Sequence, residues 1–245
     1  LTSPLSYSFQ PRIIPLQLIS LTLVLALTVK RPRLITKHFT APNIPSVGSF
    51  LQMSDQSTLL KDAGLYGFSK LYARQSVVNL WQQLEEKNSE EGCDGKLITG
   101  PPGCGKSSLV FLWACHHAIQ TESTVRWIHF NLQRFPILMT LDGKTNQASS
   151  EVMGSSMISA EQVERFGNDL IICDSVLAGN FNTITQAMTV CVTQPIYVTS
   201  VQVRYHPHNF RVLVIGMDSW KFSEYVSACS DAVFLSQVRS FLKGN

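Results

Sequence analysis

The hydrophobic residues of this chain follow two different spacings from residue 68 onward. Short apolar runs, each ending in a polar residue or glycine, predict buried strands near residues 97, 126, 170, 196 and 212. Longer amphipathic or wholly apolar stretches predict helices over 68–87, 107–119, 159–166 and 181–190, and from Ser219 to the end. Ser159 and Gln162 form a capping-box pattern at the start of one of these helices. Residues 133–158, rich in Ser, Gly, Asn and Thr, are predicted to be irregular.

Strands separated by helices are typical of an α/β fold whose parallel sheet is covered by helices on both faces. The apolar content of 44% and the charged content of 15% support a sizeable core. They also exclude a disordered or collagen-like chain. We therefore expect a five-stranded, mostly parallel sheet sandwiched by helices, with further helices at the C-terminal end.

Residues 1–52 differ from the rest of the chain in charge and in pattern. They hold five lysine and arginine side chains and no acidic one, which leaves 15 basic and 17 acidic side chains for residues 53–245. The apolar run 13–29 would reach about 25 Å as a helix, less than the roughly 30 Å hydrocarbon core of a membrane. We expect residues 1–52 to lie outside a folded domain that spans 53–245. A membrane anchor and a signal sequence are the alternatives for this segment.

The composition narrows the partners and the compartment. The slightly acidic balance of residues 53–245 is not typical of nucleic-acid-binding domains, and a membrane contact is expected only through 13–29. The six cysteines show neither Cys-x-x-Cys pairs nor zinc-finger spacing to a histidine. We interpret them as reduced, mostly buried thiols of an intracellular protein, cytoplasmic or nuclear. His116–His117 and His206–Pro207–His208 resemble metal ligands only superficially. The first pair occupies adjacent helix positions, which face different directions, and the second segment is loop-like.

The most specific chemical pattern is GPPGCGKS at 100–107, which fits the phosphate-loop spacing G-x-x-x-x-G-K-[ST]. Gly103 and Gly105 allow the backbone to curl so that successive N–H groups face a phosphate. Lys106 would reach the β- and γ-phosphate oxygens, and the hydroxyl of Ser107 would bind Mg²⁺. The candidate nucleotide-binding residues are Gly100, Pro101, Pro102, Gly103, Cys104, Gly105, Lys106, Ser107 and Ser108. A glycine-rich turn without a ligand is the alternative, and Cys104 is interpreted as a spacer.

An acidic residue that ends another buried strand would complete the metal site. The run LIICD places Asp174 in this position, 68 residues after Lys106, where it would hold Mg²⁺ through a water. A helix cap or a strand-end carboxylate with local partners is the alternative. Many P-loop ATPases have a glutamate next, as the base that orients the attacking water, whereas this chain has Ser175. Its presence argues against efficient hydrolysis.

Two further candidates follow later strands. Thr199 and Ser200 end the strand near residue 196, where such folds often place a polar residue that faces the γ-phosphate. We take Ser200 as a candidate catalytic residue beside Lys106 and Asp174; ordinary strand-end hydrogen bonding is the alternative. Arg204 is a weaker candidate for a positive charge near the phosphates.

Several segments together resemble the P-loop NTPase domain of crinkler effectors and retrotransposon hot spot proteins. The resemblance rests on LYARQSVVNLW (71–81), LITGPPGCGKSSLVFLW (97–113), LIICD (170–174), YVTS (197–200) and SWKFSEYVSACS (219–230). Within these, Tyr72 and Arg74 match an aromatic-x-Arg pattern before the loop. Trp220, Glu224 and Tyr225 match a tryptophan that opens a later helix. The family continues beyond this helix, so the resemblance implies that a C-terminal module is missing, and it allows secretion into a host cell.

These observations predict a P-loop NTPase with the strand order of the additional-strand class, which binds ATP or GTP with Mg²⁺ and hydrolyses it slowly. The alternative from another class is a nucleotide-binding switch or protein-interaction module that binds without turnover, with a protein partner still to be identified. A small-molecule or nucleic-acid kinase would need an arginine-rich lid, and no arginine cluster follows the loop.

Overall fold

The computed structural model describes residues 36–52, 57–65, 70–86, 93–130, 135–200 and 211–229, together with Leu235, Arg239 and Ser240. Its strands are β1 (Thr36–His38), β2 (Phe50–Gln52), β3 (Lys70–Tyr72), β4 (Gly95–Thr99), β5 (Thr124–His129), β6 (Ile137–Asp142), β7 (Gln147–Val152), β8 (Leu170–Asp174), β9 (Ile196–Val198) and β10 (Val212–Gly216). Its helices are α2 (Ser57–Asp62), α3 (Gln75–Glu85), α4 (Lys106–Thr121), α5 (Ala160–Phe166), α6 (Ala178–Ala187), the short 3-10 helix η2 (Met188–Val190) and α7 (Phe222–Ala228).

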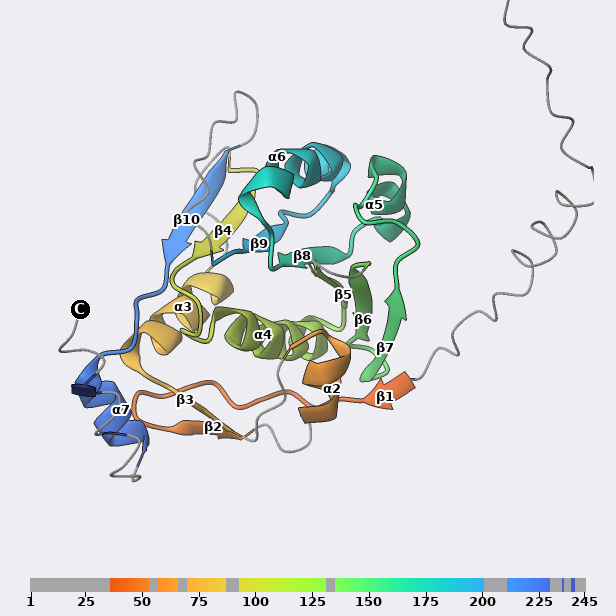
Figure 1. Ribbon diagram of the computed structural model, residues 1–245. Helices are drawn as coiled ribbons and strands as arrows, with labels where there is room; N and C mark the ends of the chain where they lie inside the picture. The colour runs from red at the N-terminus through yellow and green to blue at the C-terminus, as the bar shows by residue number, and fades with distance from the viewer. Residues whose placement is uncertain are drawn as a thin grey trace, which may run out of the picture. The chain divides into compact units, whose positions relative to one another are not determined.

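Eight strands form one mixed sheet in the order β1-β7-β6-β5-β8-β9-β4-β10, and β2 pairs with β3 in a separate ribbon (Figure 1). The run β5-β8-β9-β4-β10 is parallel throughout. These are the five strands that the apolar runs predicted, and the α/β fold class is confirmed. The remaining strands β6, β7 and β1 extend the sheet in antiparallel fashion.

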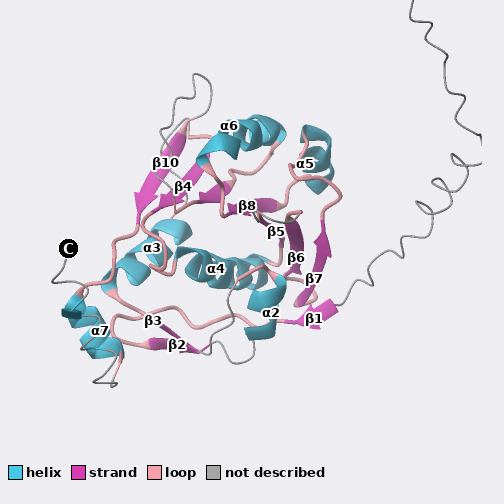
Figure 2. Cartoon of the chain, in the orientation of Figure 1, coloured by secondary structure: helices cyan, strands magenta, loops and turns pink. Residues whose placement is uncertain are grey.

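Helices cover both faces of the sheet, with α2, α3 and α4 on one side and α5 and α6 on the other (Figure 2). Alternating residues of a strand enter different cores: Ile98 packs with α3 and α4, whereas its neighbour Leu97 packs with α5 and α6. Helix α4 is buried from Ser108 to Cys115, as its apolar run predicts, because it lies between the sheet and a further layer of α2, α3 and the β2–β3 ribbon.

One correction concerns residues 133–158, which were expected to be irregular. Most of them form the antiparallel hairpin β6–β7, joined by a four-residue turn at 143–146. The sequence QASSEV of β7 has low strand propensity, and pairing with the strongly apolar β6 overrides it. Gly143 allows this turn to approach α4, because a Cβ there would lie 1.8 Å from the carbonyl oxygen of Ala118.

A second correction concerns the predicted domain boundary at residue 52. Residues 36–52 are part of the fold: β1 pairs with β7 at one edge of the large sheet, and β2 pairs with β3. Phe39 and Leu51 are buried in the main core. The sequence pattern concealed these strands because each has only three residues and is stabilised by distant partners. The basic and apolar part of the segment, 1–35, lies outside the described residues.

The predicted helix over 68–87 is shorter than expected, since α3 begins at Gln75 and β3 occupies part of the preceding stretch. The capping box of Ser159 and Gln162 is confirmed: each contributes a side chain that bonds to the other's backbone. The last predicted helix is α7 in its described part, and Phe222 rather than Ser219 begins it. Within the described residues, no helix is both long enough and apolar enough to cross a membrane.

Candidate functional site

The predicted site residues lie at the carboxyl edge of the parallel strands. Strands β4, β5, β8 and β9 run in the same direction, so their C-terminal ends meet at one side of the sheet. The phosphate-loop sequence follows β4, Asp174 ends β8, and Thr199 and Ser200 follow β9. The fold therefore gathers residues that are up to a hundred positions apart in the sequence at one edge.

The backbone of residues 100–105 adopts conformations that require glycine. Gly103 and Gly105 have φ values of 76° and 95°, in the left-handed region. Gly100 has a φ of 151°, and a Cβ on it would lie 2.2 Å from the carbonyl oxygen of Met217, which follows β10. Helix α4 then begins at Lys106 without a side-chain cap, so its first-turn N–H groups are directed toward the loop. This is the local geometry of an anion-binding turn.

The Lys106 side chain folds back over this loop. Its ammonium donates to the carbonyl oxygens of Gly100 and Pro101, each at 2.8 Å, and contacts the Sγ atom of Cys104 at 3.4 Å. Lys106 is 4% exposed and Cys104 is 2% exposed. The ammonium thus lies within the loop, held by uncharged acceptors.

A second buried cation supports the loop from outside. The Arg74 guanidinium donates from Nη2 to the carbonyl oxygen of Cys104 at 3.1 Å and to that of Asp218 at 2.5 Å. Its Nη1 atom donates to the carbonyl oxygen of Ser219 at 2.9 Å, and Glu224 lies 3.5 Å away. Sequence analysis assigned Arg74 no role beyond its match to the family pattern, because all these partners come from distant segments.

The Asp174 carboxylate is fully buried, and its two oxygens have different surroundings. Oδ2 lies 2.7 Å from Nδ1 of His129 and accepts a hydrogen bond from the Ser175 hydroxyl at 3.2 Å. Oδ1 is buried and has no hydrogen-bond partner in the described part of the chain. An ionised carboxylate only accepts hydrogen bonds, so the tautomer of His129 that suits an ionised Asp174 has its proton on Nδ1. One oxygen is thereby oriented, and the other has no partner among the described residues.

His129 is a site residue that the sequence analysis missed. The sequence analysis predicted a strand near residue 126 but gave its last residue no role, whereas β5 ends at His129 and pairs it in register with Asp174. Two neighbouring apolar strands that both end in a polar residue are the pattern that would have found it. Its ring packs against Gly64, where a Cβ would come within 2.3 Å of the imidazole.

The residues after Asp174 and after β9 differ from one another in exposure. Ser175 has a φ of 59°, an unusual value for a residue other than glycine, and its hydroxyl is directed to Asp174. The Thr199 hydroxyl donates to the carbonyl oxygen of Val176 at 2.7 Å in the protein interior, which is the strand-end hydrogen bonding considered as its alternative. Ser200 is exposed at the same edge. Arg204, His206 and His208 lie outside the described residues.

Among the described residues, no group of three or more His, Cys, Asp and Glu side chains is arranged to hold a metal ion. Mg²⁺ in phosphate-transfer sites needs fewer protein ligands, since it keeps several waters and shares the phosphates of the substrate. The buried Oδ1 of Asp174 fits such a role because no residue in the described ranges is hydrogen-bonded to it. Ser107, in the first turn of α4, and Asp174 are the residues that would hold the ion.

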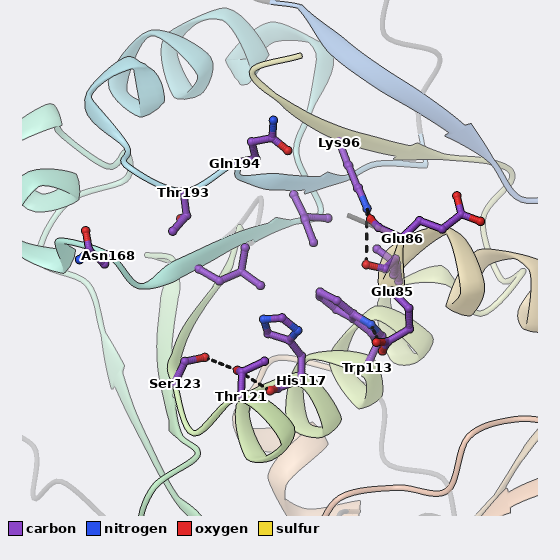
Figure 3. A pocket seen from close by; sticks show the side chains of 13 residues that line it. Glu85, Glu86, Lys96, Trp113, His117, Thr121, Ser123, Asn168, Thr193 and Gln194 are labelled. Atoms are coloured by element: carbon purple, nitrogen blue, oxygen red, sulfur yellow. Dashed lines mark hydrogen bonds between the residues drawn. The ribbon is translucent and has the colours of Figure 1, made fainter. Parts of the chain in front are cut away.

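A cavity of about 400 Å³ lies at the opposite, amino edge of the strands (Figure 3). Trp113 and His117 of α4 stack along one wall with ring centroids 4.8 Å apart, and the Trp113 indole donates to Glu85 at 2.7 Å. The Lys96 ammonium donates to the carbonyl oxygens of Gln83, Leu84 and Glu86 in the last turn of α3. Burial lowers the pKa of Lys96 and that of His117, despite the opposing effect of nearby glutamates.

Several cysteines are buried in the protein interior, and His116 and His117 pack against aromatic rings. None of the six cysteines forms a disulfide, and three of them, Cys104, Cys115 and Cys173, are buried. Burial raises the pKa of the Cys115 and Cys173 thiols, which keeps them protonated. His116 packs edge-on against Trp81, whereas His117 stacks on Trp113.

Comparison of the chain with models of known protein families and with curated protein sequences finds no match.

Proposed function

We propose that this chain is a P-loop nucleoside-triphosphate-binding protein that hydrolyses ATP or GTP slowly with Mg²⁺. The observation that carries the proposal is the loop of residues 100–107 between β4 and α4. Its left-handed glycines, uncapped helix start and enclosed Lys106 ammonium suit a bound phosphate chain. The resemblance to crinkler effectors and retrotransposon hot spot proteins belongs to the same proposal.

The sheet order supports this reading independently. Strand β8, which ends in Asp174, is separated from the loop strand β4 by the parallel strand β9. An extra strand between these two strands is the feature that gives the additional-strand class of P-loop NTPases its name. The spacing of the phosphate-loop motif and Asp174 along the sequence does not require β9 to lie between β4 and β8. The strand order therefore supports the P-loop assignment separately from the motif.

Each residue has a distinct task in the proposed reaction. The loop N–H groups and the Lys106 ammonium bind the phosphates and neutralise their charge. Mg²⁺ supplies Lewis-acid polarisation of the phosphoryl oxygens when bound. Asp174 would hold the ion through its Oδ1 atom, and His129 fixes the carboxylate through Oδ2. Ser200, exposed at the same edge, would contact the γ-phosphate.

A binding-only switch is the second candidate function, and Ser175 favours it. The residue after Asp174 bears no carboxylate, and its hydroxyl is directed back to Asp174 rather than toward an attacking water. Without a positioned base we expect phosphate release well below the median enzyme turnover of about 10 s⁻¹. Under this alternative, the bound nucleotide controls contacts with a protein partner.

Titration of a fluorescent Mg-ATP analogue tests the proposal. Lys106→Ala should weaken binding by roughly ten- to a hundredfold, because charge-assisted contacts worth about 1.5–3 kcal/mol are lost. Lys144→Ala is the matched control, since Lys144 lies exposed in the β6–β7 turn. Equal affinities of folded wild type and Lys106→Ala would refute the phosphate-loop assignment. Phosphate release measured on the same proteins separates slow hydrolysis from binding alone.

A further inference from the structure

The Arg74 side chain connects three segments that are far apart in the sequence. It begins at the N-terminal end of α3, reaches Cys104 in the phosphate loop, and contacts the connection between β10 and α7 through Asp218 and Ser219. The guanidinium also lies over the ring of Trp220, 5.2 Å from its centroid. A single side chain that is 1% exposed therefore links the loop to the entry of α7.

The charge of this guanidinium is only partly compensated. Three of its acceptors are neutral carbonyl oxygens, the nearest carboxylate is Glu224 at 3.5 Å, and its buried Nε has no partner in the described residues. Burying a cation in this way costs free energy unless negative charge approaches it. An anionic phosphate chain at the loop would bring such charge close to Arg74, so the two should stabilise each other.

Helix α7 depends on the same cluster for its position. None of its residues is buried, and Val226 is 50% exposed. Its first turn is capped by Glu224, whose Oε2 accepts from the Lys221 N–H at 2.7 Å and also faces Arg74. The ring of Trp220 stacks on that of Tyr225 in α7, with ring centroids 4.9 Å apart. The Trp220 ring is also tilted against the ring of Tyr72, at a centroid distance of 6.1 Å. An element with so few buried contacts opens easily, so its stability is sensitive to Arg74.

We propose that Arg74 is a positioning residue that couples the phosphate loop to α7, so that a nucleoside triphosphate bound at the loop stabilises residues 218–228. This inference rests on the proposed nucleotide binding and adds its consequence for the C-terminal part of the fold. When phosphates hold the loop, the Cys104 carbonyl and the guanidinium are fixed together. Arg74 then holds Asp218, Ser219 and Glu224 in the arrangement that caps α7. By linkage, α7 strengthens nucleotide binding by the same factor.

Hydrogen exchange of the full chain, measured with and without saturating Mg-AMPPNP, tests the coupling. In wild type, exchange of peptides covering 218–228 should slow by about fivefold or more on binding. Arg74→Lys keeps the charge, but its single ammonium nitrogen replaces the two Nη atoms that reach Cys104 and Asp218 from one and Ser219 from the other, so this protection should disappear. Glu224→Gln, which leaves the guanidinium in place, should reduce protection and weaken nucleotide affinity by the same factor.

Arg126→Lys is the matched control, because Arg126 also pairs with a carboxylate, Asp169, and lies over an aromatic ring, but in the middle of β5. It should leave the protection of 218–228 unchanged. Full nucleotide-dependent protection in Arg74→Lys, or binding to wild type without protection of 218–228, would overturn the coupling alone. Failure of wild type to bind Mg-AMPPNP would overturn the proposed function and the coupling with it. If Arg74→Lys does not fold, Glu224→Gln decides: unchanged protection and affinity overturn the coupling.

Discussion

Lys106 and Lys96 lie at opposite edges of the parallel strands, and both ammonium groups are buried and donate to backbone carbonyl oxygens. The acceptors of Lys96 belong to the last turn of α3, where no further helical turn would satisfy them. The acceptors of Lys106 belong to a loop whose Gly103 and Gly105 are left-handed. At the same edge lies the Asp174 carboxylate, whose Oδ1 has no hydrogen-bond partner among the described residues. Similar burial therefore serves helix termination at one edge and, in our proposal, phosphate binding at the other.

The difference extends to the groups around each lysine. At the amino edge the polar side chains bond to one another, as Trp113 does to Glu85, and the positive φ values there, at Glu122 and Gly167, belong to the C-terminal ends of α4 and α5. At the carboxyl edge Ser175, Gly100, Gly103 and Gly105 have positive φ values. Of these four residues only Ser175 is strained, since glycine adopts positive φ readily, and strained residues other than glycine are enriched at functional sites. The comparison predicts that substitutions at the two edges affect different measurements.

The largest expected effect comes from removing residues 1–52, so that the chain begins at Met53. The loss of buried Phe39 and Leu51 alone should lower the free energy of unfolding by about 3–6 kcal/mol, at about 1.5–3 kcal/mol for each side chain. Denaturant titration of both proteins measures this difference. Unchanged stability would show that residues 36–52 do not contribute to the core that carries the carboxyl edge.

Gly100→Ala should damage the carboxyl edge next most severely. The added Cβ would meet the carbonyl oxygen of Met217, and β4 and β10 would have to separate, at a cost of about 3 kcal/mol or more. Gly103→Ala is the control, because nothing lies within 4 Å of its Cβ and only the positive φ remains, at about 1–2 kcal/mol. Equal midpoints in thermal unfolding of the two variants would contradict the close approach at Gly100.

Lys96→Met should lower the free energy of unfolding by about 1.5–3 kcal/mol without changing nucleotide affinity, because three carbonyl oxygens lose a charged donor. Lys106→Ala should also lower stability, because two carbonyl oxygens lose their donor, but unlike Lys96→Met it should weaken nucleotide binding. Thermal unfolding and nucleotide titration on both variants test the comparison directly. A loss of affinity in Lys96→Met with the fold intact would mean that the two edges are not independent.

The smallest expected effect is a pH dependence at the amino edge. Burial lowers the pKa of His117 below its usual 6.5, with His116 and Lys96 acting in the same direction and Glu85 against them. The unfolded chain therefore binds a proton before the folded one as the pH falls through 6.5, so wild type loses stability there. His117→Gln should lose less stability over this interval. Denaturant titrations between pH 7 and pH 5 compare the two, and parallel curves would contradict the prediction.

The sequence predicted the elements that depend on local pattern. Five parallel strands, the apolar α4 and the capping box at Ser159 follow from the spacing of residues that are neighbours in the chain. The glycine-rich turn before α4 was also recognised in the sequence, because its residues occupy fixed positions in one continuous segment, and its binding of phosphate stays a prediction. Strands β1, β2, β3, β6 and β7 were missed, since the first three have only three residues each and the β6–β7 hairpin lies in a segment rich in Ser, Gly, Asn and Thr.

Only the tertiary structure determined which side chains meet. Asp174 was predicted from its strand, but its His129 partner depends on the register between β5 and β8, which no local pattern specifies. The contacts of Arg74 join residues up to 150 positions apart, and their geometry depends on how β10 and α7 follow the loop strand. The spacing of apolar and polar residues along a segment reflects the backbone preference of that segment and the face that it buries, and both can be predicted from the sequence. The pairing of distant charges and carbonyl groups is decided when the sheet order brings their strands together.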